Sequence, residues 1–170
     1  MYYQTIQQFI KMLNNLNNFL DKAVVYSEEK KCDINNILTA RLAVDQFNLI
    51  KQIQVISDNA KNTTARFVGQ EAPKFEDNEK NIQELKERIT KTSEYLKQFK
   101  EEDFSNSSNQ KITLPFMPGK YIDGEDYLIE FAIPNFYFHF TTAYSILRNC
   151  GVNVGKFDYI GSVNFKPLEE

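Results

Sequence analysis

Apolar residues recur every three or four positions through the first part of the chain, a spacing that lines one face of a helix. This stripe consists of Ile6, Phe9, Ile10, Leu13, Leu16, Leu20, Ala23 and Val24. It predicts a first helix over about residues 3 to 28. Asp33 follows the stripe and can cap the next helix, because its carboxylate can accept a hydrogen bond from a free backbone N–H group.

A second helical pattern extends over about residues 34 to 68. Its apolar stripe comprises Leu49, Ile53, Ile56, Ala60 and Phe67. Other apolar residues lie off this stripe, so the helix should be buried on more than one side. An interruption is expected near Ala43–Asp45, where Asp45 can start a fresh turn. Gly69 suits the left-handed residue that follows a helix end.

The third pattern is the clearest, because charged residues fill almost every position outside its apolar stripe. The stripe is Ile82, Leu85, Ile89, Thr92, Leu96 and Phe99. It predicts a helix over about residues 78 to 100. The mixed charges of residues 84–88 (ELKER) are typical of a solvent-exposed helix face.

Residues 112–122 (ITLPFMPGKYI) indicate two short extended runs around a Pro-Gly turn, which predicts a small β-hairpin. A fourth helix should follow Asp123-Gly124 and run to about Cys150, apolar or aromatic on every side and therefore the most buried. The tail, residues 152–170, should be non-helical and pack on the bundle through Phe157, Tyr159 and Ile160.

Together these elements predict an all-α fold: one domain over residues 1–170, built as an antiparallel four-helix bundle with a small hairpin before the last helix. A length of 170 residues suits a single core. In an antiparallel bundle Cys32 and Cys150 would lie at opposite ends, too far apart for a disulfide. Both cysteines are expected to be reduced thiols.

The charge pattern excludes several classes of partner. The formal net charge is −3, and the basic residues are interleaved with acidic ones, so no stripe favours nucleic acid. The apolar fourth helix contains Glu130, Asn135 and His139, which makes membrane insertion costly. Because the first residues lack a basic and an apolar signal region, we expect a cytoplasmic protein.

His139 is the single histidine and the main candidate for chemistry. Asn135, His139 and Thr142 share one helix face at i, i+4 and i+7. Pro134 removes a backbone N–H group beside them, so a polar stripe and an expected kink coincide in the most apolar helix. A lone histidine on a helix is also common as a hydrogen-bonded core residue, and this alternative stays open.

Partners for the buried polar stripe should come from the second helix, because unpaired polar groups are costly to bury. The candidates are Gln54 and Asp58, with Arg41 and Asp45 near the helix start. Asp58 is either a surface carboxylate or a group that orients His139. Arg41 and Asp45, four residues apart, favour an ion pair that fixes the helix start.

Three strings carry a family resemblance: residues 40–47 (ARLAVDQF), 134–144 (PNFYFHFTTAY) and 154–161 (VGKFDYIG). They resemble a bacterial family of uncharacterised proteins that is related to the DinB/YfiT group of metalloenzyme-like proteins. The resemblance extends from about Ile6 to Gly161. It implies a four-helix bundle, often dimeric, with a metal held by one histidine of the second helix and a His-x-x-x-His pair of the fourth.

This chain departs from that metal pattern. One partner position of His139 holds Asn135, the other holds Ala143, and the second helix has no histidine. A divalent transition metal requires about three good N, O or S ligands. The sequence therefore predicts no metal and no other cofactor.

The leading hypothesis is a metal-free bundle, with a homodimer as an open expectation, that binds a small molecule in a polar pocket between helices two and four. In its enzymatic form His139 is a general acid or base that Asp58 or Asn135 orients. An alternative is an interaction module in which the same residues form a buried network without catalysis. A metal- or thiol-dependent transferase of the DinB type is the second alternative. The sequence does not decide whether the chain is an enzyme.

Overall fold

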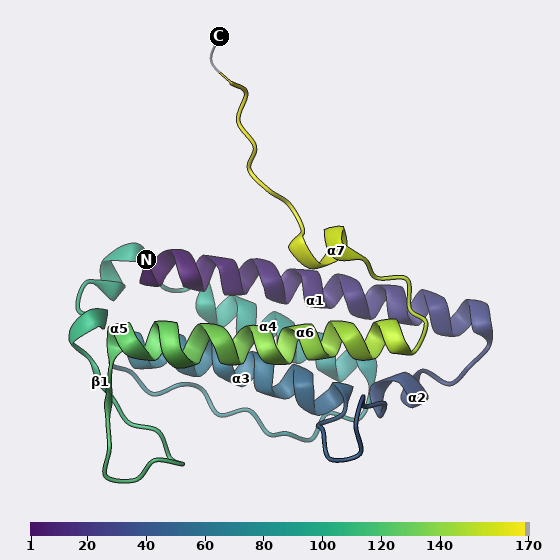
Figure 1. The fold of residues 1–170 in the computed structure, drawn as a ribbon, viewed down its shortest axis with the longest axis horizontal. Coiled ribbons are helices and arrows are strands. Elements are labelled where there is room, and N and C mark those ends of the chain that lie inside the picture. The colour runs from purple at the N-terminus through teal and green to yellow at the C-terminus, as the bar shows by residue number, and fades with distance from the viewer. Residues whose placement is uncertain (169–170) are drawn as a thin grey trace.

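The computed structural model describes residues 1–168 as a mostly helical chain with a small two-stranded sheet, as the hydrophobic pattern predicted (Figure 1). The long helices are α1 (Tyr2–Lys30), α3 (Leu49–Phe67), α4 (Ile82–Leu96) and α6 (Ile133–Asn149). The shorter elements are α2 (Ile34–Leu38), η1 (Glu101–Phe104), η2 (Ser107–Asn109), β1 (Lys111–Ile112), β2 (Ile122–Asp123), α5 (Gly124–Asp126), η3 (Tyr127–Ala132) and α7 (Lys156–Ile160).

The four long helices lie side by side, but they are not all antiparallel to their neighbours. The start of α1 meets the end of α3, where the rings of Tyr2 and Phe67 pack edge to face. By contrast, α1 and α6 run in the same direction, with Phe9 stacked on Phe136 at 4.1 Å between ring centroids (Figure 1). The prediction of a strictly antiparallel arrangement is therefore wrong for this pair.

The helices α3 and α4 are the second parallel pair, and the segment that joins them explains how. Residues 68–81 return along the length of the molecule before α4 begins, so that α4 starts beside the start of α3 (Figure 1). An extended segment of this length spans roughly 40 Å or more, which exceeds the length of α4. A long connection permits a parallel neighbour, whereas a short loop would have enforced an antiparallel one.

The second predicted helix is two helices separated by a non-helical segment. Asp33 caps α2 as expected, since its side chain accepts a hydrogen bond from the Asn35 N–H. The helix α3 begins only at Leu49, where the Asn48 side chain accepts from the Lys51 N–H. Residues 39–48 are irregular and largely exposed, so the fresh turn predicted at Asp45 is wrong by a few residues. The prediction for Gly69 is correct, because its φ is 69°.

The last helical stretch is continuous from Gly124 to Asn149 but changes its winding before Pro134. Residues 127–132 form a π-helical turn, and Pro134 stands in the first turn of α6. Because proline has no N–H group, the regular bonding of the preceding turn is already broken there, and a wider turn absorbs the mismatch. The expected irregularity at Pro134 is thus a π turn.

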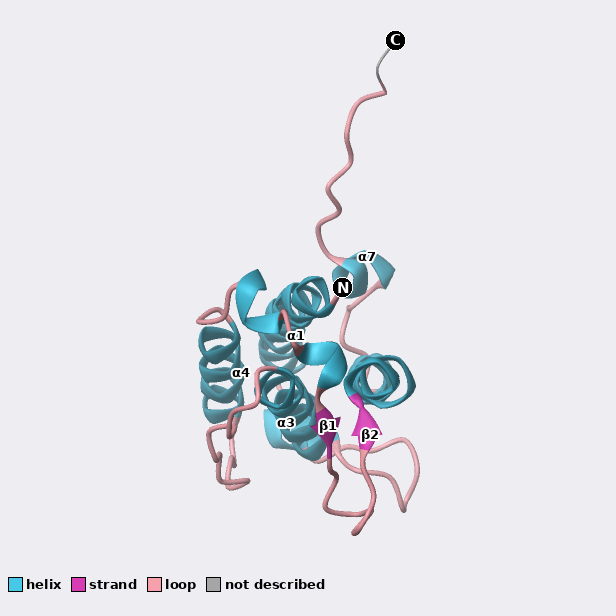
Figure 2. Ribbon diagram, turned by 90° about the vertical axis from the view of Figure 1, so that its left-hand side faces the viewer, coloured by secondary structure: helices cyan, strands magenta, loops and turns pink. Residues whose placement is uncertain are grey.

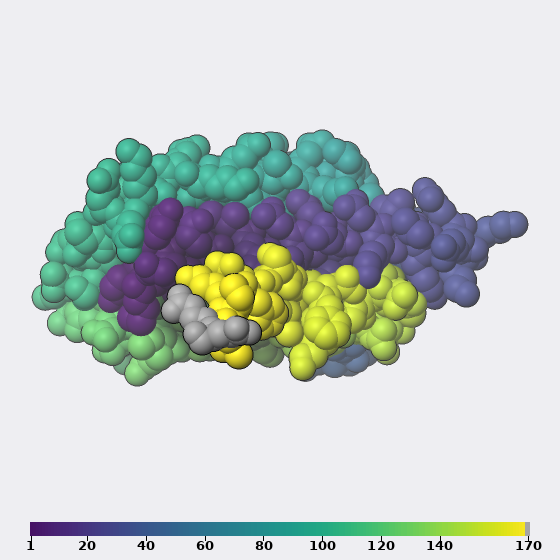
Figure 3. Space-filling view, turned by 90° about the horizontal axis from the view of Figure 1, so that it is seen from above, coloured from purple at the N-terminus to yellow at the C-terminus, as the bar shows by residue number. Residues whose placement is uncertain are grey.

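The hairpin and the chain end lie outside the long helices. The strands β1 and β2 pair antiparallel, with Ile112 opposite Ile122, beneath the ends of α3 and α6 (Figure 2). The short α7 lies across α1 and α6, and residues 161–168 extend away from the helices (Figures 1 and 3). The prediction of a non-helical tail is wrong over Lys156–Ile160, which form α7. Tyr159 packs on Phe140 as expected, but Phe157 is 86% exposed, so its predicted packing is also wrong.

The two cysteines are free thiols at the same end of the molecule, because α1 and α6 are parallel (Figure 1). Burial raises the pKa of the Cys150 thiol, and the neighbouring Cys32 adds to this rise. The prediction that they lie at opposite ends is therefore wrong. Among residues 1–168, no helix is both long and apolar enough to cross a membrane.

Candidate functional site

His139 lies on the face of α6 that packs against α3, and only 8% of its surface is exposed. Its Nδ1 atom is 2.7 Å from the Oε1 atom of Gln52, on α3. An amide oxygen can only accept a hydrogen bond, so Nδ1 must carry the proton. This contact therefore selects the tautomer of His139 in which Nε2 holds a lone pair.

The orientation of Gln52 is fixed in turn by the segment that precedes α3. Its Nε2 atom donates to the backbone carbonyl of Phe47 over 3.0 Å. A carbonyl can only accept, so the amide nitrogen of Gln52 must face Phe47 and the amide oxygen must face His139. The Phe47 ring stacks near the imidazole, with 6.4 Å between centroids. Carbonyl, amide and imidazole thus form one directed chain of hydrogen bonds.

The Nε2 atom of His139 ends this chain without a partner among residues 1–168. Among residues 1–168, the fully buried side-chain N and O atoms without a hydrogen-bond partner do not include this Nε2 atom, so it keeps contact with solvent. Burial lowers the pKa of His139, which keeps the ring neutral near pH 7. A neutral imidazole with a free Nε2 can accept a hydrogen bond or a proton from a bound molecule.

The other two polar residues of the predicted stripe contribute less. Thr142 is buried, but its hydroxyl donates to the carbonyl of Phe138 in the preceding turn of its own helix. Asn135 is half-buried one turn before His139 and forms no side-chain hydrogen bond among the described residues. Asn135 therefore remains available to a ligand, whereas the Thr142 hydroxyl is already satisfied.

Gln54 and Asp58, also predicted as partners of His139, lie on the opposite side of α3. Residues two positions apart on a helix point in nearly opposite directions, so Gln54 faces α4 while Gln52 faces α6. Gln54 donates to Glu79 at 2.8 Å, and Asp58 accepts from Arg88 at 2.7 Å. The structure thus does not bring either residue to His139.

Arg88 is the centre of this second cluster and is 2% exposed. Its guanidinium bonds to Asp58, Asp77 and Glu79 at 2.7, 3.1 and 2.8 Å. Burial opposes ionisation of Asp77 and Glu79, but hydrogen bonds from Lys51, Arg88 and Gln54 outweigh it and lower the pKa of both carboxyls. The cluster fastens the connecting segment 68–81 to α3 and α4. The prediction that residues 84–88 form a solvated face is wrong for Arg88.

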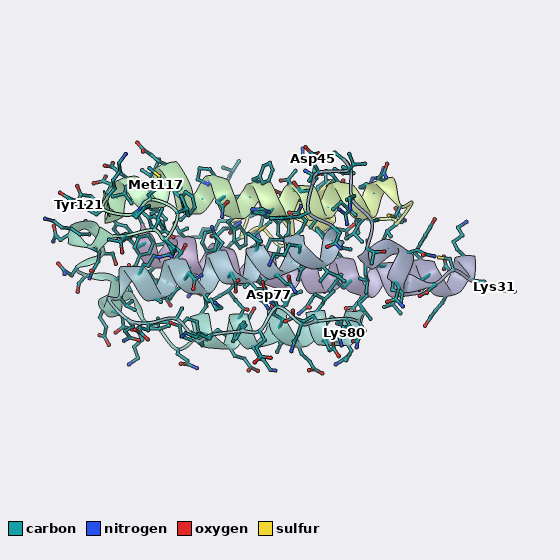
Figure 4. All side chains as sticks on the ribbon, turned by 90° about the horizontal axis from the view of Figure 1, so that it is seen from below. Lys31, Asp45, Asp77, Lys80, Met117 and Tyr121 are labelled. Atoms are coloured by element: carbon teal, nitrogen blue, oxygen red, sulfur yellow. The ribbon has the colours of Figure 1, made fainter. Side chains whose placement is uncertain are left out.

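Arg41 and Asp45 lie in the irregular segment and are exposed. Arg41 donates to the carbonyl of Val44 at 3.5 Å, and the predicted ion pair with Asp45 is not among the ion pairs of residues 1–168. Figure 4 shows Asp45 on the α6 side of the molecule, whereas Asp77 lies between α3 and α4. Neither Arg41 nor Asp45 contacts His139.

Comparison with known proteins places this arrangement in a family. Residues 1–160 match the family described as "Domain of unknown function (DUF1993)". The chain belongs to the DUF1993 family. It is also similar to a DinB family member protein from Shewanella denitrificans, whose crystal structure matches with a TM-score of 0.94 and 49% sequence identity. The similarity covers 98% of this chain and 95% of that chain. No match was found among curated proteins.

The metal site that the DinB resemblance implies can be compared with the described residues of this chain. Within residues 1–168, no three His, Cys, Asp or Glu side chains converge as a metal site. The helix α3 contributes an amide, Gln52, to His139, and it contains no histidine. One imidazole and one amide oxygen fall short of the roughly three good donors that a transition metal needs. The residues present therefore do not fit that metal.

Sequence reasoning missed Gln52 and Arg88, although both lie on apolar stripes. Gln52 stands between Leu49 and Ile53, and Arg88 stands next to Ile89 on the buried side of α4. A long polar side chain on an apolar stripe is buried with its neighbours and must find a partner. That positional signal was present in the sequence and would have identified both.

Proposed function

We propose that this DUF1993 protein binds a small molecule at His139 without the help of a metal. The single observation behind this proposal is the directed chain from the Phe47 carbonyl through Gln52 to the His139 Nδ1. Here two consecutive bonds fix the tautomer and leave an oriented lone pair on Nε2 in contact with solvent.

The groups around the Nε2 atom of His139 define the ligand class. A neutral Nε2 acceptor favours a molecule that presents an N–H or O–H group. The free side chain of Asn135 adds both a donor and an acceptor one helical turn away. The rings of Phe47 and Phe138 beside the imidazole provide apolar contact. We infer a small, uncharged hydrogen-bond donor with an apolar part.

A second candidate function is supported by a different observation. Five surface depressions, of about 210 to 380 Å³, are lined by other residues, and His139 and Gln52 line none of these five. The position of His139 outside these five depressions favours a structural network within an interaction module. In that case the chain of hydrogen bonds serves only to fix the segment 39–48 on the bundle.

We also infer that the four long helices form a bundle of the DinB type, with a parallel crossover between α3 and α4. The fold neighbour from Shewanella supports this inference. The two free thiols suit a reducing compartment such as the cytosol, which remains part of the proposal.

The two functions are distinguished by observing the His139 ring itself. The protein is labelled with ¹⁵N-histidine, which gives a single ring system, and titrated with phenols, primary amides and primary alcohols. Ligand binding predicts that one class shifts the Nε2 resonance strongly and raises the melting temperature. The stabilisation should disappear in His139→Gln and persist in Gln54→Ala, a control on the opposite face of α3. If no class shifts Nε2 at millimolar concentration, the structural function is favoured instead.

A further inference from the structure

The largest of these five surface depressions lies at the hairpin, and His139 does not line it. It measures about 380 Å³, which is within the range of small-molecule sites. Its walls are Arg66 and the loop 113–121 between the two strands. Figure 4 shows Met117 and Tyr121 of this loop at the end of the molecule opposite Lys31. None of its lining residues belongs to the His139 site.

Arg66 gives this cleft a positive charge without a counter-ion. It lies in the last turn of α3 and is half-buried. Arg88 on α4 bonds to three carboxylates, whereas Arg66 takes part in none of the ion pairs found among residues 1–168. A half-buried guanidinium without an acidic partner retains its capacity to bind an anion.

The guanidinium of Arg66 is held in place by a buried tyrosine. Arg66 Nη1 donates to the hydroxyl of Tyr127 over 2.8 Å, and Tyr127 is fully buried. The same hydroxyl lies 3.1 Å from the Thr63 hydroxyl, so it can accept from Arg66 while it donates to Thr63. Tyr127 opens the π-helical turn η3, a feature that is frequent at functional sites. One edge of the guanidinium is thus anchored, and its remaining N–H groups stay free.

The loop supplies apolar contact and one more cation. Met117 and Tyr121 are 44% and 56% exposed and line the cleft with apolar surface. Lys120 also lines the cleft. Among residues 1–168, no carboxylate lines this cleft, whereas Glu130 lines an adjoining depression of about 270 Å³ that shares Met117, Lys120 and Tyr121 with it. The cleft therefore combines apolar walls with positive charge.

We propose that this cleft binds a small organic carboxylate, independently of the His139 site. The free N–H groups of Arg66 donate to the carboxylate, and the apolar body of the ligand lies against Met117 and Tyr121. The two oxygens of a carboxylate match the planar fork of the one anchored guanidinium, and a monoanion needs less positive charge to compensate it than a phosphate dianion does. The carboxylate is therefore preferred over a phosphate ester of the same size.

The probes are benzoate, its neutral isostere benzamide, and phenyl phosphate, all at constant ionic strength. The chain has three methionines, so ¹³C-methyl labelling gives few signals, and Met117 reports on the cleft while the buried Met12 is an internal control. Benzoate should shift the Met117 methyl with saturation at millimolar concentration, and benzamide should bind at least about tenfold more weakly. Equal shifts with benzoate and benzamide, no saturable shift, or tighter binding of phenyl phosphate would each overturn the proposal.

Variants of Arg66 test whether its charge is responsible for benzoate binding. Arg66→Gln should weaken benzoate binding about tenfold or more, and Arg66→Lys should recover part of the loss, because it keeps the charge but loses the planar fork. Arg41→Gln removes an exposed arginine at a distant site and should leave binding unchanged. Unchanged binding in Arg66→Gln would contradict the proposal. The comparison of the wild-type protein with benzoate and benzamide decides the matter even if that variant fails to fold.

Discussion

Two glutamines of α3, two positions apart, lead to two different kinds of buried polar site. Gln52 joins His139 in a neutral chain of hydrogen bonds that ends in a free lone pair. Gln54 joins Glu79 at the edge of a charged cluster, in which Arg88 bonds to three carboxylates. The ions of the charged cluster compensate one another, although the buried Arg88 Nε atom has no hydrogen-bond partner among residues 1–168. The neutral site is incomplete, and an incomplete polar site is the better candidate for a ligand.

The difference also concerns what each site holds together. The carboxylates of Asp77 and Glu79 come from the crossover segment, so the Arg88 cluster is needed to place that segment and with it the parallel helix α4. The Gln52 chain holds only the short segment 39–48 through one carbonyl. Disrupting the Arg88 cluster should therefore lower the free energy of unfolding much more than disrupting the Gln52 chain.

The largest effect is expected for Arg88→Leu. The substitution leaves three carboxylates close together without their common partner, and breaking a buried ion pair in this way costs about 3 to 5 kcal/mol. Unfolding in denaturant measures the loss. Lys86→Leu, on the same helix, removes only a surface ion pair with Asp21 and should cost less than about 1 kcal/mol.

The pH dependence of Arg88→Leu sharpens this prediction. Because hydrogen bonds from Arg88 help to lower the pKa of Asp77 and Glu79, the stability they contribute is present above their unfolded pKa of about 4. It is lost as the pH falls through the lowered values. The difference in free energy of unfolding between wild type and Arg88→Leu should therefore become smaller in acid. A difference that does not change with pH would contradict the role given to the cluster.

An intermediate effect is expected for Gln52→Leu. The change removes the acceptor of the His139 Nδ1–H, and an unpaired buried donor costs about 1 to 3 kcal/mol. Gln54→Leu should cost less, because Glu79 keeps its bond to Arg88. Denaturant melts of the two variants compare the two faces of α3 directly. A larger loss in Gln54→Leu would reverse the comparison.

The smallest effect is the pH dependence that His139 itself contributes. Burial lowers the pKa of His139 in the folded state, so the unfolded chain takes up a proton first as the pH falls. Its contribution to stability is therefore complete above the unfolded pKa of about 6.5 and is lost as the pH falls through the folded pKa. Wild type should lose more stability than His139→Gln between about pH 7.5 and pH 5.5. Equal losses would indicate that burial does not perturb this imidazole.

The fold was predictable from the sequence where local pattern decides it. The stripes of α1 and α4, the cap at Asp33 and the left-handed Gly69 depend on neighbours within a few residues. The helix directions were not predictable in this way, because the long segment 68–81 permits either a parallel or an antiparallel α4. The prediction that Cys32 and Cys150 lie at opposite ends of the molecule was wrong for the same reason.

The candidate site was predictable only in part. His139 stood out by its residue type, but its partner was sought at Gln54 and Asp58 and lies at Gln52. Which face of a long helix meets which neighbour depends on the order of the helices in space, and both sides of α3 are buried. The break predicted near Ala43–Asp45 exists, but it extends over residues 39–48, because the Asn48 cap that starts α3 gives only a weak local signal.

The tautomer of His139 is the most direct test of the account. A long-range ¹H–¹⁵N spectrum of the ¹⁵N-histidine protein distinguishes a protonated ring nitrogen from one with a lone pair. We expect Nδ1 to be protonated and Nε2 to be unprotonated from about pH 6.5 to 8, and Gln52→Leu to release a mixture of tautomers. A proton on Nε2 in the wild-type protein, or a ring that is already charged at pH 7, would contradict the proposed site.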